Sequence, residues 1–287
     1  MPSSVNWHAY YRLTRLDKPV GIWLLLWPTL WGLLIAGAGY PDPWVATVFV
    51  LGTILMRSAG CALNDIADRG WDGAVARTQR RPLATGEISV KEAYAVALGL
   101  SLLAFALVCT LGMQVVLWSV PALFLAVSYP YTKRFFAIPQ AYLGIAFGFG
   151  IPMAFVALQG QVPSIAWWLL LANILWSVAY DTAYAMVDRE DDLKIGIRSS
   201  AITFGRWDVL AILVCQVVML AIVAGVAWQL MLGWAFWLGW LFAALQLVRQ
   251  YRLISRRQRE DCFKGFLENI WIGGALTAGM ACGYYLG

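Results

Sequence analysis

Nine long apolar segments, separated by short polar connections, follow one another along this chain. Each has about the 20 residues that an α-helix needs to cross the ~30 Å hydrocarbon core of a bilayer. They lie at about residues 20–39, 44–62, 92–111, 114–130, 137–158, 163–186, 208–227, 229–248 and 266–286. This pattern predicts an all-α, polytopic membrane protein with nine transmembrane helices, built as a single integral-membrane domain over residues 1–287.

Composition excludes an ordinary soluble domain. Hydrophobic residues make up 61% of the 287 residues and charged residues 13%, whereas soluble domains average about 45–50% and about 25%. The net charge of +5 does not require nucleic acid as a partner, because basic connections that face anionic lipid account for it. The five cysteines show no metal-binding spacing, so we expect them to pack as small apolar side chains.

Basic residues are confined to alternate connections. All 21 lysines and arginines lie in or beside the tail of about residues 1–19, the loops at about 63–91 and 186–207, the pair at 133–134 and the segment 249–264. By the positive-inside rule, this distribution predicts a cytoplasmic N-terminus and, after nine crossings, a periplasmic C-terminus. The tail has no transit or signal pattern, so we expect a bacterial inner membrane.

Two acidic clusters stand out in this apolar chain. They read Asn64-Asp65-x-x-Asp68-x-x-x-Asp72 and Asp188-x-x-x-Asp192, the second preceded on the same helix face by Asp181 and Tyr184. The i, i+4 spacing predicts that each closing Asp pair shares one face of a helix. Carboxylates beside membrane segments are costly, and hard divalent cations are what such oxygen clusters usually hold. The clusters therefore predict a magnesium site.

An internal repeat relates the two clusters. The separation of Asp68 from Asp188 equals that of Asp72 from Asp192, and four predicted crossings put both clusters on the same side. Such a pattern is typical of two parallel-repeat halves, here expected around one central cavity at the cytoplasmic boundary. Each following loop is rich in Arg and Lys. Carboxylates, magnesium and guanidinium groups together suit a diphosphate.

At these residues the sequence resembles the UbiA superfamily of intramembrane aromatic prenyltransferases. The NDxxDxxxD signature of that superfamily stands here at residues 64–72, and its DxxxD signature at residues 188–192. A closer similarity, to the 4-hydroxybenzoate polyprenyltransferases of ubiquinone biosynthesis, is carried by residues 16–21, 26–29, 80–83, 181–186 and 194–199. The resemblance runs from about residue 10 to residue 206, and the last three spans match only in being apolar.

The resemblance implies a nine-helix bundle with an Mg²⁺-dependent active site that opens to lipid. The implied metal ligands are Asn64, Asp68 and Asp72 for one ion and Asp188 and Asp192 for the other, with Asp65 and Asp181 as weaker candidates. The four aspartates Asp68, Asp72, Asp188 and Asp192 are also the expected catalytic residues. Candidates for diphosphate contacts are Arg69, Lys194 and Arg198; candidates for the carboxylate of an aromatic substrate are Arg134 and then Arg15.

The implied reaction is transfer of a polyprenyl group from polyprenyl diphosphate to the 3-position of 4-hydroxybenzoate, ortho to the hydroxyl, with release of diphosphate. Magnesium and basic side chains would stabilise the leaving diphosphate, and the membrane would keep water from the allylic cation. Either an aspartate near the metals or the released diphosphate could remove the ring proton. The generic apolar residues that would line the prenyl groove do not reveal the length of the prenyl chain.

Three alternatives differ in chemistry. A sister prenyltransferase would use a naphthoate, haem or chlorophyll-type acceptor. A secondary transporter also uses repeats and intramembrane acids, but its site is expected near the bilayer midplane at broken helices, whereas these acids lie at the ends of two spans. A magnesium channel would need acidic rings along a pore, and Asp42 is the one acid on the predicted outer side.

Overall fold

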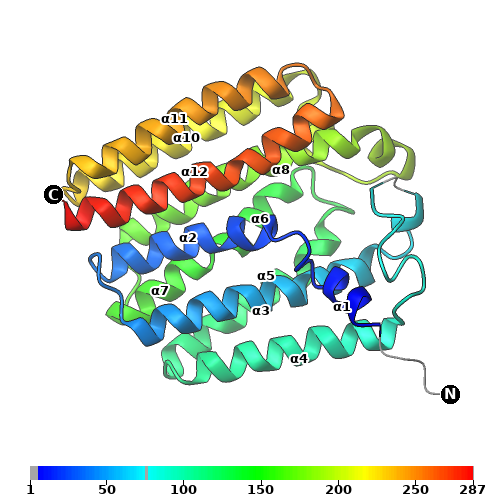
Figure 1. The fold of residues 1–287 in the computed structure, drawn as a ribbon, viewed down its shortest axis with the longest axis horizontal. Coiled ribbons are helices and arrows are strands. Elements are labelled where there is room, and N and C mark those ends of the chain that lie inside the picture. Colours follow the sequence, from blue (N-terminus) through cyan, green and yellow to red (C-terminus); the bar gives the residue numbers. More distant parts are fainter. Residues whose placement is uncertain (1–5, 75–76, 287) are drawn as a thin grey trace.

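The computed structural model describes residues 6–74 and 77–286, and every regular element within these ranges is a helix (Figure 1). The elements are α1 (Trp7–Leu13), α2 (Val20–Ala36), α3 (Pro43–Asp68), η1 (Asp72–Ala74), α4 (Val90–Cys109), α5 (Met113–Thr132), α6 (Pro139–Gly148), α7 (Gly150–Gln159), α8 (Ser164–Ile195), α9 (Ser200–Phe204), η2 (Gly205–Trp207), α10 (Asp208–Gln229), α11 (Trp234–Ile254) and α12 (Arg259–Tyr285). The prediction of an all-α fold is confirmed.

The predicted apolar segments fall on α2, α3, α4, α5, α6 with α7, α8, α10, α11 and α12. Five stretches of the described chain are long and apolar enough to cross a membrane: Pro43–Asp68, Val90–Cys109, Met113–Thr132, Pro139–Gln159 and Ser200–Gln229. Of these, α4 and α5 bury the smallest share of their surface inside the protein, as helices that face lipid should. The total of nine crossings stays a prediction.

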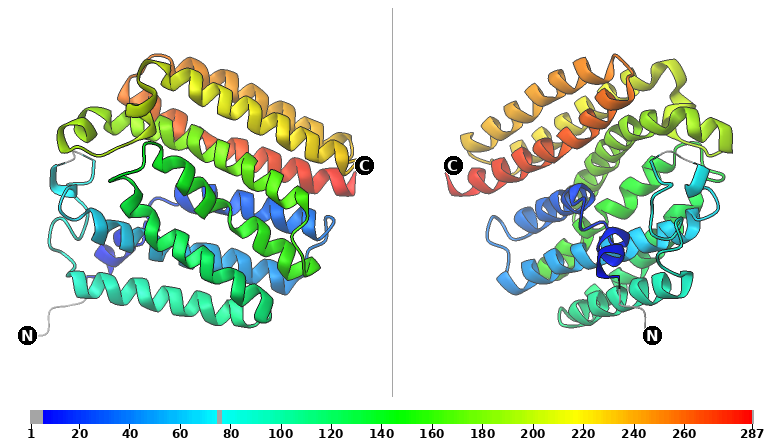
Figure 2. Two further views of the ribbon diagram at one scale, coloured as in Figure 1. Left: turned by 180° about the vertical axis from the view of Figure 1, so that it is seen from behind. Right: turned by 45° about the vertical axis from the view of Figure 1, so that its right-hand side comes forward.

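Three groups of helices lie side by side, with α10, α11 and α12 at one side and α3, α4 and α5 at the other (Figure 2). Between them, α2 packs on α7 and α12, and α8 packs on α6, α10 and α12. Trp31 of α2 and Trp176 of α8 stack at the centre of the core, with ring centroids 5.3 Å apart and no exposed surface. Their indole N–H groups donate to Thr277 and Asn269 of α12, both at 2.9 Å. The stacked rings and these two buried hydrogen bonds hold α2, α8 and α12 together.

The fifth predicted span is broken at Phe149, which separates α6 from α7. Helices α6 and α8 approach closely at Gly144 and Gly148: a Cβ on Gly144 would lie 2.7 Å from the Cα of Ile174 on α8, and one on Gly148 would lie 2.7 Å from the side-chain nitrogen of Asn173. Asn173 of α8 donates to the carbonyl of Gly144 at 2.8 Å. A small-residue face thus lets the two backbones approach, and α8 is held firmly against α6.

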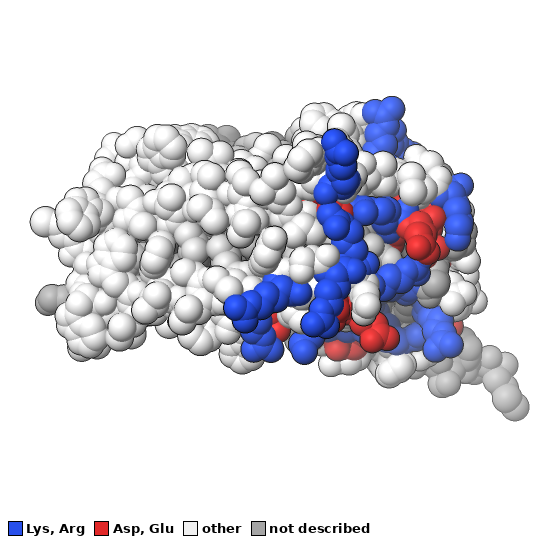
Figure 3. Space-filling view, turned by 90° about the horizontal axis from the view of Figure 1, so that it is seen from above, with Lys and Arg blue, Asp and Glu red and all other residues white. Residues whose placement is uncertain are grey.

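Charged side chains gather at one end of the molecule on the face shown in Figure 3, and the described residues that cover the rest of that face are other than Lys, Arg, Asp and Glu. The segment between α3 and α4 and the segment between α8 and α10 both lie at this end (Figure 1). The two acidic clusters therefore share one end of the bundle, as the repeat predicted.

Candidate active site

The first acidic cluster lies at the C-terminal end of α3 and on the turn that follows it. Helix α3 ends at Asp68, and Asp72 lies on the 3-10 turn η1. The prediction that Asp68 and Asp72 share one helix face is therefore wrong. The chain turns back here because Arg81 draws Asp72 toward α3: its guanidinium lies 2.9 Å from Asp72 and 3.0 Å from Asp65.

The second cluster lies on α8 itself. Asp188 and Asp192 fall one turn apart on this helix, as their spacing predicted, and the helix continues to Ile195. It ends at Gly196, whose positive φ of 73° lets its N–H return to the carbonyl of Asp192. The segment expected to be a loop from about residue 186 is thus helical for its first ten residues.

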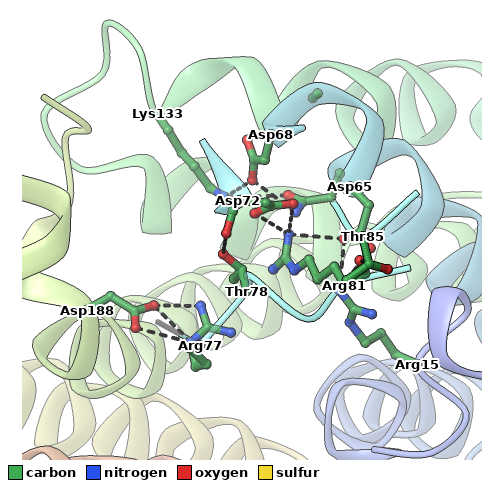
Figure 4. Close-up of polar contacts among 12 residues, drawn as sticks. Arg15, Asp65, Asp68, Asp72, Arg77, Thr78, Arg81, Thr85, Lys133 and Asp188 are labelled. Atoms are coloured by element: carbon green, nitrogen blue, oxygen red, sulfur yellow. Dashed lines mark hydrogen bonds and ion pairs between the residues drawn. The ribbon is translucent and has the colours of Figure 1, made fainter. Parts of the chain in front are cut away.

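Basic side chains hold the carboxylates of both clusters (Figure 4). The Nε of Arg77 donates to the two oxygens of Asp188 at 3.1 and 3.0 Å, and its guanidinium lies 4.4 Å from the ring centroid of Tyr184. Lys133, which follows α5, lies 3.1 Å from Asp68. Arg77 and Lys133, from different segments, therefore each neutralise one carboxylate, Asp188 in the second cluster and Asp68 in the first.

Asp65 is bound by two guanidinium groups. Arg15 donates to its oxygens at 2.8 and 3.1 Å, and Arg81 lies 3.0 Å from it. Asp65 is 1% exposed, so its charge requires these partners. This pairing ties the N-terminal tail and the segment after η1 to α3, which gives Asp65 a structural task in addition to any contact with a metal.

A cavity of about 670 Å³ adjoins both clusters. Its polar end is lined by Arg15, Arg57, Asn64, Asp65, Arg77, Arg80, Arg81, Lys133 and Asp181. Its apolar part includes Leu24, Phe49, Met56, Phe147 and Met153. Phe105 of α4 and Leu123 of α5 also line it and are 48% and 45% exposed, so the apolar part reaches the outer surface of these helices. A central cavity was predicted, and this cavity joins a cationic end to an apolar one.

Basic side chains lie between the cavity and most of the clustered carboxylates. In the described part of the chain, Asn64, Asp65 and Asp181 line it, but the four expected catalytic aspartates do not. Three cations line the cavity and also form ion pairs with these aspartates: Arg77 with Asp188, Arg81 with Asp72 and Lys133 with Asp68. These three cations lie where an anionic ligand in the cavity would meet the carboxylates.

The other cations expected at the site lie outside the cavity lining. Arg69 caps α3 and is exposed, and the side chain of Lys194 is 74% exposed. Arg198 donates to the carbonyl of Phe135 at 2.9 Å. Arg134 donates to the carbonyl of Ala67 at 3.3 Å and stacks 5.0 Å from the ring of Trp71. These four residues lie in segments beside the two clusters, and their positions in the sequence gave no information on the direction of their side chains.

Arg57 is a cavity residue that the sequence analysis did not assign. It lies within α3, two turns before Asn64, and its guanidinium is 5.6 Å from the ring of Phe147. Its buried Nε has no hydrogen-bond partner among the described residues. Gly21 of α2 makes room for it, because any side chain there would overlap the guanidinium. An arginine inside an apolar run is costly without a purpose, and that signal could have identified it.

Two carboxylates of the clusters, Asp72 and Asp192, have a raised pKa. Burial raises the pKa of Asp72 to about 6, against the opposing charge of Arg81. Burial and the neighbouring charge of Asp188 raise the pKa of Asp192 to about 7. Desolvation disfavours the charged form in both cases, so these two carboxylates are poised to gain from a bound cation.

The donor atoms fit magnesium, although no three carboxylate, imidazole or thiol groups within residues 6–74 and 77–286 converge into a preformed metal centre. Asp68 Oδ1 is buried without a hydrogen-bond partner in this range, while its Oδ2 accepts from Asn64 at 3.1 Å. All the available donors are carboxylate or amide oxygens, which Mg²⁺ prefers. The cations that now face these oxygens would have to give way to the metal.

Comparison with known proteins agrees with this geometry. The profile of the UbiA prenyltransferase family matches residues 25–273. The 4-hydroxybenzoate octaprenyltransferase of Methylobacillus flagellatus is 60% identical, covering 96% of this chain and 94% of its own. The enzyme of the same name from an Azoarcus species is 58% identical over 97% of both chains. The similarity thus extends well past residue 206, into the last three helices.

Solved structures share the fold. A UbiA homologue from Aeropyrum pernix has a TM-score of 0.79 at 26% identity, covering 88% of this chain and 95% of that one. A UbiA homologue from Archaeoglobus fulgidus, solved with GPP and Mg²⁺, has a TM-score of 0.65 at 18% identity, covering 97% and 98%. Two acidic clusters at one end of a helical bundle, a shared cavity and these similarities lead to one assignment: the chain is an integral membrane protein of the UbiA prenyltransferase family.

Proposed function

We propose that this protein transfers a polyprenyl group from polyprenyl diphosphate to the 3-position of 4-hydroxybenzoate, with Mg²⁺ as cofactor and diphosphate as the second product. The observation that carries the proposal is the single cavity that joins a cationic end beside two acidic clusters to an apolar part reaching the surface of α4 and α5. The full-length similarity to enzymes named 4-hydroxybenzoate octaprenyltransferase supports this acceptor over the naphthoate, haem or chlorophyll types.

The carboxylates of the two clusters would hold the metal. Asn64, Asp68 and Asp72 are the proposed ligands of one ion and Asp188 and Asp192 of the other, with Asp65 and Asp181 as weaker candidates. Bound Mg²⁺ would stabilise the negative charge that develops on the leaving diphosphate. Asp68 Oδ1, which is buried and has no hydrogen-bond partner within residues 6–74 and 77–286, is an atom that such a cation would satisfy.

Cations at the cavity would bind the diphosphate. Arg77, Arg81 and Lys133 line the cavity and now neutralise Asp188, Asp72 and Asp68. When the carboxylates bind metal instead, these three groups become free to donate to phosphate oxygens, and Arg forks suit that geometry. Arg69, Lys194 and Arg198 remain proposed as outer contacts, because loop positions at this end can reorient on ligand binding.

Arg57 would recognise the carboxylate of the aromatic substrate. Its guanidinium lies in the cavity beside Phe147, and its buried Nε–H has no hydrogen-bond partner in the described part of the chain. An anionic group of the right size would gain a charge-assisted hydrogen bond there. Arg15 lines the same cavity but is shared with Asp65. Arg134 stays a candidate only if the segment after α5 moves, since it now faces Ala67 and Trp71.

The apolar part of the cavity would hold the prenyl chain and exclude water. Phe105 and Leu123, exposed on the outer surface and also lining the cavity, mark where a long chain would continue into lipid. Exclusion of water protects an allylic cation from hydrolysis. A site carboxylate or the released diphosphate accepts the ring proton. The charged end would face the cytoplasm of a bacterial inner membrane, by the positive-inside rule.

The proposal is tested with membranes that contain the expressed protein. These receive 4-hydroxybenzoate and a polyprenyl diphosphate, with Mg²⁺ present or chelated by EDTA, and the products are followed by mass spectrometry. Magnesium-dependent 3-polyprenyl-4-hydroxybenzoate is the expected product. Prenylation of a naphthoate acceptor alone would reassign the substrate, and absence of product with every aromatic acceptor would revive the transporter alternative.

A further inference from the structure

A buried ion cluster lies behind the second acidic motif. Its centre is Asp208, the first residue of α10, which has no exposed surface. Its carboxylate accepts from two guanidinium groups, Arg189 of α8 and Arg257 of the connection between α11 and α12, and from the N–H of Val209 at 2.6 Å. One carboxylate thus joins three segments that are distant in sequence, all at the charged end of the bundle (Figure 1).

Arg189 connects this cluster to the proposed metal ligands. It follows Asp188 directly, but successive helix residues are turned by about 100°, so its side chain leaves on another side of α8. There it also donates to the carbonyl of Ala201 at 2.8 Å, whereas Asp188 accepts from Arg77, which lines the cavity. One turn of α8 therefore carries a metal-site carboxylate on one side and an anchoring arginine on another.

Arg257 completes the anchor from the C-terminal helices. Its backbone has a positive φ of 52°, an uncommon conformation outside glycine. Its guanidinium donates from Nε and Nη2 to Asp208 at 3.1 and 2.8 Å, and from Nη2 to the carbonyl of Arg206 at 2.8 Å. The connection between α11 and α12 is thereby fixed to the start of α10 by a fork of hydrogen bonds, which is more specific than a single ion pair.

The motif-bearing end of α8 needs such an anchor. It extends beyond the predicted span into the polar end of the molecule, where the last turns of a helix lack intrahelical partners for their carbonyls. Magnesium demands near-ideal octahedral geometry, so small displacements of its ligands weaken binding. Arg259 also contacts this end of α8, at Glu190 and at Asp191, the latter at 3.6 Å. Neither of these carboxylates is as fully buried as Asp208, and more exposed pairs contribute less. The side chain of Glu190 is 74% exposed.

We propose that Asp208, Arg189 and Arg257 are positioning residues that hold Asp188 and Asp192 in the geometry required for metal binding. This inference rests on the proposed metal-dependent function. Helices α10, α11 and α12 contain neither acidic motif. Through the ion pairs of Asp208 with Arg189 and Arg257 they would nevertheless hold the end of α8 that carries Asp188 and Asp192. The cluster does not touch substrate; it acts through the backbone of α8.

The test compares two neighbouring arginines by direct metal binding. Arg257→Gln removes the fork on Asp208. Arg256→Gln is its matched control, since Arg256 forms an ion pair with Asp261 at 3.9 Å and, among the described side chains, forms none with α8. The purified full-length protein is titrated with Mn²⁺ alone and free Mn²⁺ is followed by electron paramagnetic resonance. We expect Arg257→Gln to raise the Kd for Mn²⁺ about 10-fold, the lower range for outer-shell partners of a metal site, and Arg256→Gln to leave it unchanged.

Asp188→Asn separates this inference from the proposed function. If Asp188→Asn weakens Mn²⁺ binding while folded Arg257→Gln binds as the wild type does, the positioning role is overturned and the metal site stands. If Asp188→Asn has no effect on Mn²⁺ binding, the metal site itself is wrong. Should Arg257→Gln not accumulate in the membrane, Arg257→Lys takes its place, because a single amine cannot reproduce the fork; wild-type Mn²⁺ affinity in that folded variant likewise overturns the inference.

Positioning also predicts a kinetic signature that general destabilisation would not give. Folded Arg257→Gln should need about 10-fold more Mg²⁺ for half-maximal prenyl transfer, while turnover at saturating Mg²⁺ stays close to that of the wild type. An equal loss of turnover at every Mg²⁺ concentration would contradict positioning.

Discussion

Arg77 and Asp188 join the two halves of the site through a forked ion pair. Arg77 belongs to the segment after the first acidic cluster and Asp188 to the second cluster, and the Nε of Arg77 lies 3.1 and 3.0 Å from the two carboxylate oxygens. The ring of Tyr184 supports the guanidinium from α8. The pair connects the segment after the first acidic cluster to α8, and Arg77 lines the cavity. A ligand in the cavity that separates Arg77 from Asp188 would therefore affect both clusters.

Arg77→Gln should weaken the binding of prenyl diphosphate. We expect KM for the diphosphate to rise about 10- to 100-fold, because a charge-assisted hydrogen bond contributes about 1.5–3 kcal/mol, while KM for 4-hydroxybenzoate changes little. Arg252→Gln is the control, since Arg252 is exposed on α11 and is not part of the cavity lining. Steady-state kinetics in membranes measures both constants, and an equal rise of both would contradict a diphosphate contact.

Asp68→Ala and Asp188→Ala should each abolish turnover in protein that still inserts. Each change removes a proposed ligand and leaves a basic partner, Lys133 or Arg77, without its carboxylate, so we expect activity to fall by at least about 100-fold. Product analysis by mass spectrometry, normalised to the protein in the membrane fraction, checks the loss. Wild-type activity in either variant would remove the metal hypothesis.

The sequence predicted the helical fold well because hydrophobic segments of membrane length are a strong local signal. The internal repeat also predicted that both acidic clusters lie at one end of the bundle, which the structure confirms. Motif spacing failed at Asp72, because helix periodicity cannot show that Arg81 draws this residue out of α3. Motif spacing also missed Arg57. Its proposed role in binding a carboxylate depends on its position beside Phe147 and Gly21, which belong to other helices. The direction of a loop arginine such as Arg134 is set by tertiary contacts, which no single segment encodes.

Arg57→Gln should lose the ability to select an acceptor with a carboxylate. We expect kcat/KM for 4-hydroxybenzoate to fall about 10- to 100-fold, the equivalent of one charge-assisted hydrogen bond of about 1.5–3 kcal/mol. The uncharged 4-hydroxybenzamide provides the matched comparison, because it keeps the ring and hydroxyl. If Arg57 binds the carboxylate, the variant and the wild type should differ little with the amide. An equal loss with both acceptors would show that Arg57 has another task.

Binding of Mg²⁺ should strengthen as pH rises from about 5 to about 8. The pKa of Asp72 is raised to about 6 and that of Asp192 to about 7, so below these values each carboxylate carries a proton that the metal must displace. Above them both are charged, and the dependence should level off. Titration of the purified protein with Mn²⁺ across this range measures it. Asp192→Asn should remove the upper part of the dependence, and an unchanged profile in that variant would exclude Asp192 as a ligand.

Gly144→Ala should destabilise the fold without contacting substrate. Its Cβ would lie 2.7 Å from the Cα of Ile174 and 3.0 Å from the Cβ of Ser177 on α8, so α6 would have to move away from α8, at a cost of about 1–3 kcal/mol for overpacking. Gly225→Ala in α10 is the matched control, because a Cβ there meets nothing within 4 Å and alanine favours a helix by about 1 kcal/mol over glycine. Thermal unfolding in detergent should therefore shift to lower temperature for Gly144→Ala and remain unchanged or rise for Gly225→Ala. Equal shifts in the two variants would mean that close packing of α6 on α8 does not limit stability.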